Sequence, residues 1–200
     1  MITKDDTILC DLTNDEIREC IVTALDLIDG IVDRGDLHER SYLERFFDLV
    51  LGEISEKMVI KWLRQNGKYA ESAVDKKSGK PDLGHDIWLK DRKGTQIKCS
   101  VKSSLSALKS DMDEILANFK IACKKAETRD VNVQVYFWLE VYGNPRTTVP
   151  TDNHVAIIGW AGSKDVAMYE EEAYTTEQRK KVQLPLGNLR PMKELLIYII

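Results

Sequence analysis

The sequence predicts an α/β protein with a mixed central β-sheet flanked by helices and with a helical extension at its N-terminus. Three observations support this class. Apolar residues recur at helical spacing up to Asn66, polar and apolar residues alternate over 95–102, and two later runs are rich in β-branched and aromatic residues. The 200 residues fit one domain, which we divide into the helical extension at 1–51 and an α/β core at 52–200.

The N-terminal third of the sequence predicts three helices. Thr13 followed by Glu16 is a capping box, in which each side chain bonds an amide at the helix start, and an apolar stripe follows it. A second helix is expected over 36–51 and is interrupted at Gly52. A third is expected over 53–66, with Gly67 as its C-terminal stop.

The middle of the chain predicts a β-hairpin. A short strand is expected over 68–74, then a polar loop and a strand over 86–90. The stretch 91–94 has turn chemistry with glycine last, and a second strand is expected over 95–102. Alternation places Gln96, Lys98, Ser100 and Lys102 on one face of that strand and apolar residues on the other.

The last 95 residues or so predict a return to mixed structure. A helix capped by Ser106 or Ser110 is expected to run to Glu127, and buried strands are expected over 131–142 and 155–160. The charged stretch over 164–181 is expected to be partly helical. A closing helix is expected over 192–200.

Composition excludes several classes of protein. The net charge of −4 argues against a protein that coats nucleic acid through bulk charge. The four cysteines form no CxxC pair and the three histidines are scattered, which argues against structural zinc and a disulfide framework. No apolar run is long enough to span a membrane and no signal-peptide core is visible, so we expect a cytoplasmic protein.

Charge is nevertheless unevenly distributed. Residues 1–60 contain fifteen acids and six bases, whereas residues 87–125 contain nine bases and four acids. Most charge runs are solvated faces. Here the basic surplus coincides with the predicted hairpin, which also contains the residues with the clearest chemical potential.

That hairpin has the side chains that phosphodiester hydrolysis needs. Asp86 opens one strand, and ten residues later the partner strand presents Gln96 and Lys98 on one face. A carboxylate and an amide oxygen on neighbouring strands suit Mg²⁺, which prefers oxygen ligands and keeps several waters. A lysine beside them can orient the attacking water and neutralise a phosphate.

This order of helix, acid-bearing strand and lysine-bearing strand resembles the PD-(D/E)XK nuclease superfamily, which includes many restriction endonucleases. The resemblance covers about residues 53–125, and Gln96-Ile-Lys98 resembles the Gln-x-Lys variant of Mrr-type enzymes. It implies Asp86 and Gln96 as metal ligands, with Mg²⁺ or alternatively Mn²⁺, and Lys98 as the catalytic lysine. It further implies a glutamate from the preceding helix, for which Glu56 is preferred over Glu53.

A second register competes with the first. Ser100-Val-Lys102-Ser103-Ser104 is similar to the Glu-x-Lys-Ser-Ser ending of the superfamily, with serine in place of the acid. In this register Asp82, Ser100, Lys102 and Glu53 are the alternative site residues. We prefer the first register, in which Ser100, Lys102, Ser103 and Ser104, together with Lys98, contact DNA.

Two functions follow from the resemblance. The first is a metal-dependent, restriction-type DNA endonuclease that acts as a homodimer, because each chain supplies one site. The alternative is a nuclease-like subunit that has lost catalysis and serves in DNA binding or assembly, which the replacement of acids by Gln and Ser favours.

Overall fold

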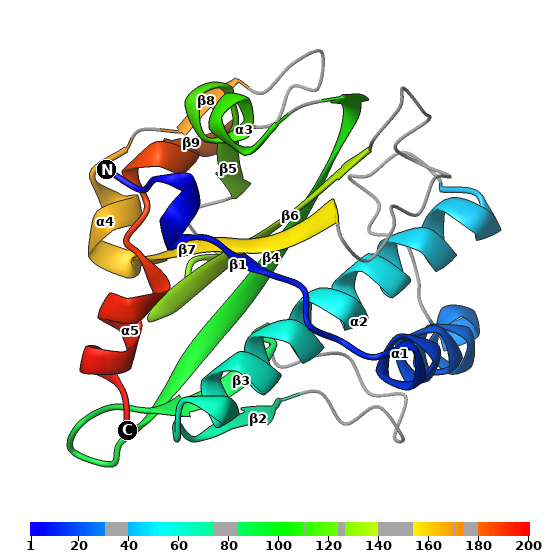
Figure 1. Ribbon diagram of the computed structural model, residues 1–200, viewed down its shortest axis with the longest axis horizontal. Helices are drawn as coiled ribbons and strands as arrows, with labels where there is room; N and C mark the ends of the chain where they lie inside the picture. Colours follow the sequence, from blue (N-terminus) through cyan, green and yellow to red (C-terminus); the bar gives the residue numbers. More distant parts are fainter. Residues whose placement is uncertain are drawn as a thin grey trace.

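A computed structural model describes residues 1–30, 40–73, 84–109, 111–123, 127–139, 154–169, 171–173 and 180–200 (Figure 1). Within them the chain forms a six-stranded sheet and a separate three-stranded sheet, flanked by helices. The six-stranded sheet has the order β1-β7-β6-β4-β3-β2, and the smaller one has the order β5-β9-β8.

The six-stranded sheet is mixed, because β4 and β6 pair in parallel while its other neighbours are antiparallel. This confirms the predicted α/β class with a mixed sheet and flanking helices. Its strands in spatial order are β1 (Ile8–Leu9), β7 (Val155–Gly162), β6 (Val131–Leu139), β4 (Gln96–Lys109), β3 (Ile87–Lys90) and β2 (Ala70–Ser72).

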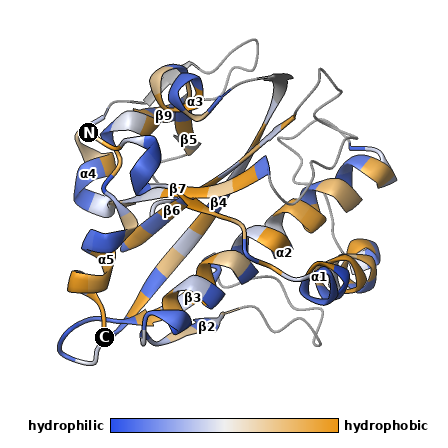
Figure 2. Cartoon of the chain, viewed as in Figure 1, coloured by the Kyte–Doolittle hydropathy of each residue, from blue (hydrophilic) through white to orange (hydrophobic). Residues whose placement is uncertain are grey.

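Each face of this sheet has its own hydrophobic core. Helices α1 (Asn14–Leu27), α2 (Tyr42–Gln65) and α5 (Met192–Tyr198) contribute to the first core. The second core contains residues of α3 (Met112–Asn118), α4 (Ser163–Ala167), β5 (Lys120–Cys123) and β9 (Lys180–Pro185), the last of which also pairs with β8 (Glu171–Ala173). Apolar residues run along both β7 and α2 (Figure 2). Three short 3₁₀ turns complete the described structure: Lys4–Asp6, Ile28–Gly30 and Leu186–Asn188.

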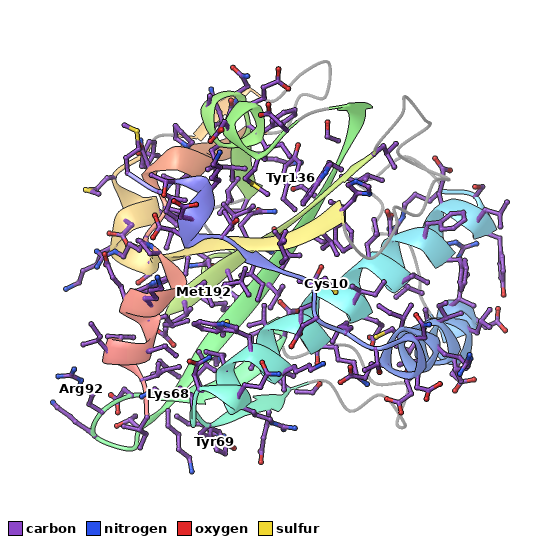
Figure 3. All side chains as sticks on the ribbon, viewed as in Figure 1. Cys10, Lys68, Tyr69, Arg92, Tyr136 and Met192 are labelled. Carbon is purple, nitrogen blue, oxygen red and sulfur yellow. The ribbon has the colours of Figure 1, made fainter. Side chains whose placement is uncertain are left out.

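The C-terminus is fixed to the end of the sheet that bears the β3–β4 turn. Lys68 Nζ donates to the carbonyl of Ile199 at 2.9 Å, and the Tyr69 amide donates to the carbonyl of Ile200 at the same distance. Arg92, in the turn, donates to the Ile197 carbonyl. These side chains lie around the C-terminal end in Figure 3. The hairpin turn and the last helix therefore support one another.

Several local predictions are confirmed. Thr13 caps α1 through the expected box with Glu16. Gly67 and Gly94 adopt φ values of +71° and +80°, as a helix stop and a tight turn require. The four cysteines are free. No helix in the described parts of the chain is both long enough and apolar enough to cross a membrane.

The predicted helix break at Gly52 is wrong. A single helix, α2, begins after Ser41 and runs through Gly52 to Gln65, so the 51/52 boundary falls inside a helix. A helical glycine costs only about 1 kcal/mol relative to alanine. Buried side chains on both sides of it, among them Leu51 and Ile54, offset that cost.

The long helix predicted from Ser106 or Ser110 to Glu127 is also wrong. Strand β4 continues to Lys109, because it pairs with β6 as far as Leu139. The helix that follows is α3, capped by Asp111 and only seven residues long, and β5 comes after it. Tertiary pairing therefore overrides local helix propensity in this segment. The stretch 164–181 is partly helical, as predicted: α4 covers its first residues, and β8 and the start of β9 lie in the rest of its described part.

Two glycines give a matched test of the packing. A Cβ at Gly52 meets nothing within 4 Å, whereas one at Gly159 in β7 meets the Ile2 side chain and lies 2.6 Å from the Arg190 carbonyl oxygen. We expect Gly52→Ala to raise the free energy of unfolding by about 0.5–1 kcal/mol and Gly159→Ala to lower it by about 1–3 kcal/mol. Urea denaturation of both variants measures this, and equal effects would contradict the packing described.

Candidate functional site

The candidate site lies at the start of β3, where its pairing with β4 stops and β4 continues alone on that side. The last pair between these strands is Ile87 with Cys99, and β4 extends ten residues further. Asp86 occupies this point. Its carboxylate accepts the Val101 amide at 2.6 Å and the Ser100 hydroxyl at 3.1 Å. Beyond the last β3–β4 pair, the Asp86 carboxylate therefore accepts the β4 hydrogen bond that a further residue of β3 would otherwise accept.

The two residues before Asp86 fix its position. Gly84 has φ of +74°, and its carbonyl accepts a bond from Arg129 Nε. A Cβ on Gly84 would lie 2.8 Å from Arg129 Nη2, a side-chain end that can shift, so it is the positive φ that favours glycine here. His85 is buried, and its ring contacts that of Trp88 edge-on, with 4.0 Å between the ring centroids. The Asp86 amide itself donates to the Cys99 carbonyl at 2.9 Å.

The strand register does not bring Asp86 beside Gln96, as the preferred register assumed. Gln96 pairs with Lys90 and Lys98 pairs with Trp88, so both lie nearer the turn than Asp86 does. The ten-residue gap does cross one tight hairpin, but the acid stands beyond the paired part of the hairpin. Ser100, from the second register, is the β4 side chain that contacts Asp86.

Polar residues follow one face of β4, as the alternation predicted. Lys98 is exposed, Ser100 is 4% exposed, and Lys102 is half-buried. Cys99, between them, points into the first core against α2. Ser103 is exposed, and Ser104 accepts a bond from Gln134 at 3.2 Å. Asp82, the alternative first acid, lies outside the described residues.

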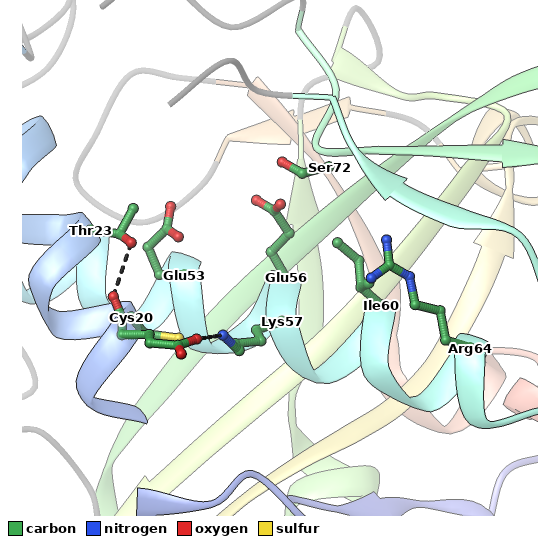
Figure 4. A pocket seen from close by; sticks show the side chains of 9 residues that line it. Cys20, Thr23, Glu53, Glu56, Lys57, Ile60, Arg64 and Ser72 are labelled. Atoms are coloured by element: carbon green, nitrogen blue, oxygen red, sulfur yellow. Dashed lines mark hydrogen bonds and ion pairs between the residues drawn. The ribbon is translucent and has the colours of Figure 1, made fainter. Parts of the chain in front are cut away.

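Helix α2 supplies an acid on the other side of β4. Glu56 is 7% exposed, whereas Glu53 one turn earlier is half-buried. Both line a cavity of about 290 Å³ between α1, α2 and β2. In Figure 4 the Glu56 carboxylate points toward Ser72 of β2. Glu56, the preferred candidate, therefore lies more deeply in the fold than Glu53.

The negative charges of Asp86 and Glu56 both act on the buried thiol of Cys99. Complete burial raises its pKa well above the ordinary value, and the negative charges of Asp86 and Glu56 raise it further. Both carboxylates are therefore near enough to this one buried group to act on it.

The residues present suit a magnesium-type ion with few protein ligands. In the part of the chain that the structure describes, no three His, Cys, Asp or Glu side chains form a metal-binding group. Mg²⁺ is commonly held by one or two carboxylates together with waters and substrate phosphates. Asp86 and Glu56 are carboxylates of this chemical type, and the Ser100 hydroxyl is a neutral oxygen next to Asp86.

Sequence reasoning missed two contributors to this site. Arg129, just before β6, holds the Gly84 carbonyl, and Ser72 of β2 lies opposite Glu56. Neither belongs to the hairpin pattern. Only the Gly-His-Asp sequence gave a signal, since a glycine two residues before a functional acid indicates a special backbone conformation.

No family model, curated protein or solved structure matches this chain.

The register can be tested through stability. Ser100→Ala removes a buried hydrogen bond to a carboxylate, and we expect it to lower the free energy of unfolding by about 1.5–3 kcal/mol. Gln96→Ala changes an exposed side chain at the turn, for which we expect a change within about 0.5 kcal/mol. Urea denaturation distinguishes the two. A larger loss for Gln96→Ala than for Ser100→Ala would contradict the register.

Proposed function

We propose that this protein is a divalent-metal-dependent DNA endonuclease that hydrolyses phosphodiester bonds. The observation that supports this best is the position of Asp86, bonded to Ser100 at the end of the β3–β4 pairing, with Lys102 two residues further on the same face. The resemblance to PD-(D/E)XK nucleases agrees with a combination of the two registers, in which Asp86 of the first stands with Ser100-Val-Lys102 of the second. The first register, with Gln96 and Lys98, lacks this contact.

In this proposal Asp86 and Glu56 are the residues that would hold Mg²⁺ or Mn²⁺. When bound, the metal supplies Lewis-acid polarisation of the phosphate and a more acidic water. Asp86 is oriented for this role because the Val101 amide fixes one of its oxygens. Glu56 is oriented by its burial on α2, which leaves its side chain few alternative positions.

Lys102 takes the role that the first register gave to Lys98. It lies two residues beyond Ser100 on one face of β4, about 7 Å along the strand. There its ammonium group donates to the attacking water or to a non-bridging phosphate oxygen, and its charge offsets the charge that develops in the transition state. Since each chain has one such site, cleavage of both DNA strands requires two copies, which is why we also propose a homodimer.

A second candidate function rests on Ser100. The resemblance places an acid at this position, and a hydroxyl brings no negative charge to a metal. A chain that had lost catalysis would keep the polar face of β4 and bind DNA without cutting it. The two candidates differ in one measurable property, metal-dependent cleavage.

Plasmid nicking tests the proposed activity. With Mg²⁺ or Mn²⁺ the protein is expected to nick supercoiled plasmid, and Asp86→Asn and Lys102→Ala are each expected to lower the rate by about 100-fold or more, because each removes a group acting on the reacting phosphate. Gln96→Ala and Lys93→Ala are the controls. Lys93 is an exposed lysine of the turn, so its removal changes the charge equally.

Three results would count against the proposal. Metal-independent nicking, or nicking that survives Asp86→Asn, would exclude Asp86 from the site. Loss of activity in Gln96→Ala with retention in Lys102→Ala would restore the first register. DNA binding without any cleavage would favour the inactive subunit.

Metal binding has a separate readout in thermal stability. A cation that binds the folded chain raises the unfolding midpoint with concentration. We expect Mn²⁺ to raise the midpoint of the wild type by a few degrees and that of Glu56→Gln hardly at all, because one of the two charged ligands is lost. Glu53→Gln, the matched control one turn away, should respond like the wild type. Equal responses of both variants would remove Glu56 from the site.

A further inference from the structure

Trp88 is a tryptophan of β3 that lies outside both hydrophobic cores. It alternates with Ile87 and Leu89, which are fully buried in the first core, so its side chain lies on the opposite face of the sheet. Trp88 is half-buried, and in the described part of the chain it belongs neither to the cores nor to the residues packed against them. Packing within a core therefore does not explain this large aromatic side chain, and tryptophan is enriched at binding surfaces.

The neighbours of Trp88 on that face are polar. Lys98 of β4 pairs with it on one side, Glu71 of β2 pairs with it on the other, and both are exposed. His85 contacts the indole ring edge-on, with 4.0 Å between the ring centroids, and is itself 1% exposed. The buried imidazole thus orients the indole from inside the protein, while part of the indole surface stays accessible to solvent.

Trp88 lies beside the candidate site. Asp86 is two residues earlier in the chain, about 7 Å along an extended backbone. Its carboxylate contacts Ser100, which is two residues beyond Lys98 on the polar face of β4. A nucleotide whose base lies against Trp88 would therefore have its phosphate close to Asp86.

The charges on this face favour a phosphate backbone. Lys90 lies on β3, and Lys98 and Lys102 follow β4. None of these three lysines forms an ion pair with a described residue. Apart from the acid of the candidate site, two acids are near: Glu71 across from the indole, and Asp130, which accepts the Lys98 amide at 2.9 Å. The lysines outnumber these two acids, so the balance of charge beside the indole is positive.

We propose that the accessible surface of Trp88 stacks against an unpaired base of the DNA strand that is cleaved, so that the substrate is single-stranded DNA. Base–aromatic stacking combined with lysines along the backbone is the usual way in which proteins bind single strands, and it tolerates any sequence because every base has a π-face. A base inside a duplex is already stacked on its neighbours and has to leave the stack before a side chain can reach it. The inference rests on the proposed function for its choice of ligand, but stacking requires neither metal nor cleavage.

This assignment also gives Lys98 a role. Its register position excludes it from direct contact with Asp86, yet it lies directly across from Trp88. With a base stacked on the indole, the ammonium group of Lys98 is placed to neutralise a phosphate of the same strand. Trp88 and Lys98 together would select which phosphodiester bond reaches Asp86.

Intrinsic fluorescence tests the stacking directly. The probe is an unlabelled oligomer of fifteen deoxythymidines, added without metal to the Asp86→Asn variant, in which an asparagine oxygen can still accept the Val101 amide. We expect the oligomer to quench the tryptophan fluorescence, and the quenching to disappear when Trp88→Phe is added. Trp62→Phe is the matched control. Trp62 is half-buried on α2 and packs against the first core, so its replacement should leave the quenching in place.

Affinity distinguishes stacking from a purely structural role. In the same Asp86→Asn background, anisotropy of a fluorescein-labelled oligomer of fifteen deoxythymidines measures the dissociation constant. Adding Trp88→Leu is expected to weaken binding of this single strand about tenfold, whereas Trp88→Phe keeps most of the affinity because a phenyl ring still stacks. Binding of a labelled duplex of fifteen base pairs is expected to change less than about twofold in Trp88→Leu, since its bases remain in the stack. A structural role for Trp88 would weaken both probes equally.

Equal losses for the two probes, or quenching that survives Trp88→Phe, would overturn the base platform. A protein that never cleaves but shows both effects of Trp88 would refute the nuclease and keep this site. A protein that cleaves and binds the single strand equally well after Trp88→Leu would do the reverse. Absence of binding to either probe would overturn both proposals.

Discussion

The geometry of the candidate site depends on β4 being much longer than its partner β3. Strand β4 has fourteen residues and β3 has four, while β6 supports β4 along its other edge. The main-chain groups of β4 beyond Cys99 therefore need another partner on the β3 side, and Asp86 supplies one for Val101. A carboxylate used in this way is held rigidly at a strand edge. The same bond that completes the sheet thus positions the acid.

Placing the negative charges of Asp86 and Glu56 near the buried Cys99 thiol has an electrostatic free-energy cost. Asp86 and Glu56 both act on the Cys99 thiol, which lies in the first core and is fully buried. Like charges in a low-dielectric setting destabilise one another, and buried charges are expected to be paired or to coordinate metals. The amide of Val101 and the hydroxyl of Ser100 offset part of this cost for Asp86.

The sequence predicted the elements better than it predicted their contacts. The capping box at Thr13, the stop at Gly67 and the turn at Gly94 depend on neighbouring residues, and local chemistry is enough to place them. The helix expected from Ser106 failed because β6, thirty residues away, extends β4. The Asp86–Gln96 pairing failed for a related reason. Spacing along a hairpin shows that two strands meet, but the length of their paired part, here only four residues, decides which side chains touch.

Under the proposed function, a serine at position 100, where the resemblance places an acid, is consistent with a working metal site once charges are counted. In the proposed site two carboxylates, Asp86 just before β3 and Glu56 of α2, would balance a divalent cation. The Ser100 hydroxyl lies 3.1 Å from the Asp86 carboxylate in a nearly buried position. A third acid at position 100 would therefore lie against Asp86. It would raise the repulsion at a point where burial makes repulsion strongest. A serine keeps an oxygen there, and its hydroxyl donates a hydrogen bond to Asp86. In the proposed site the buried Glu56 therefore supplies the negative charge that an acid at position 100 would have supplied. The two carboxylates then balance the charge of the cation that Lys102 faces.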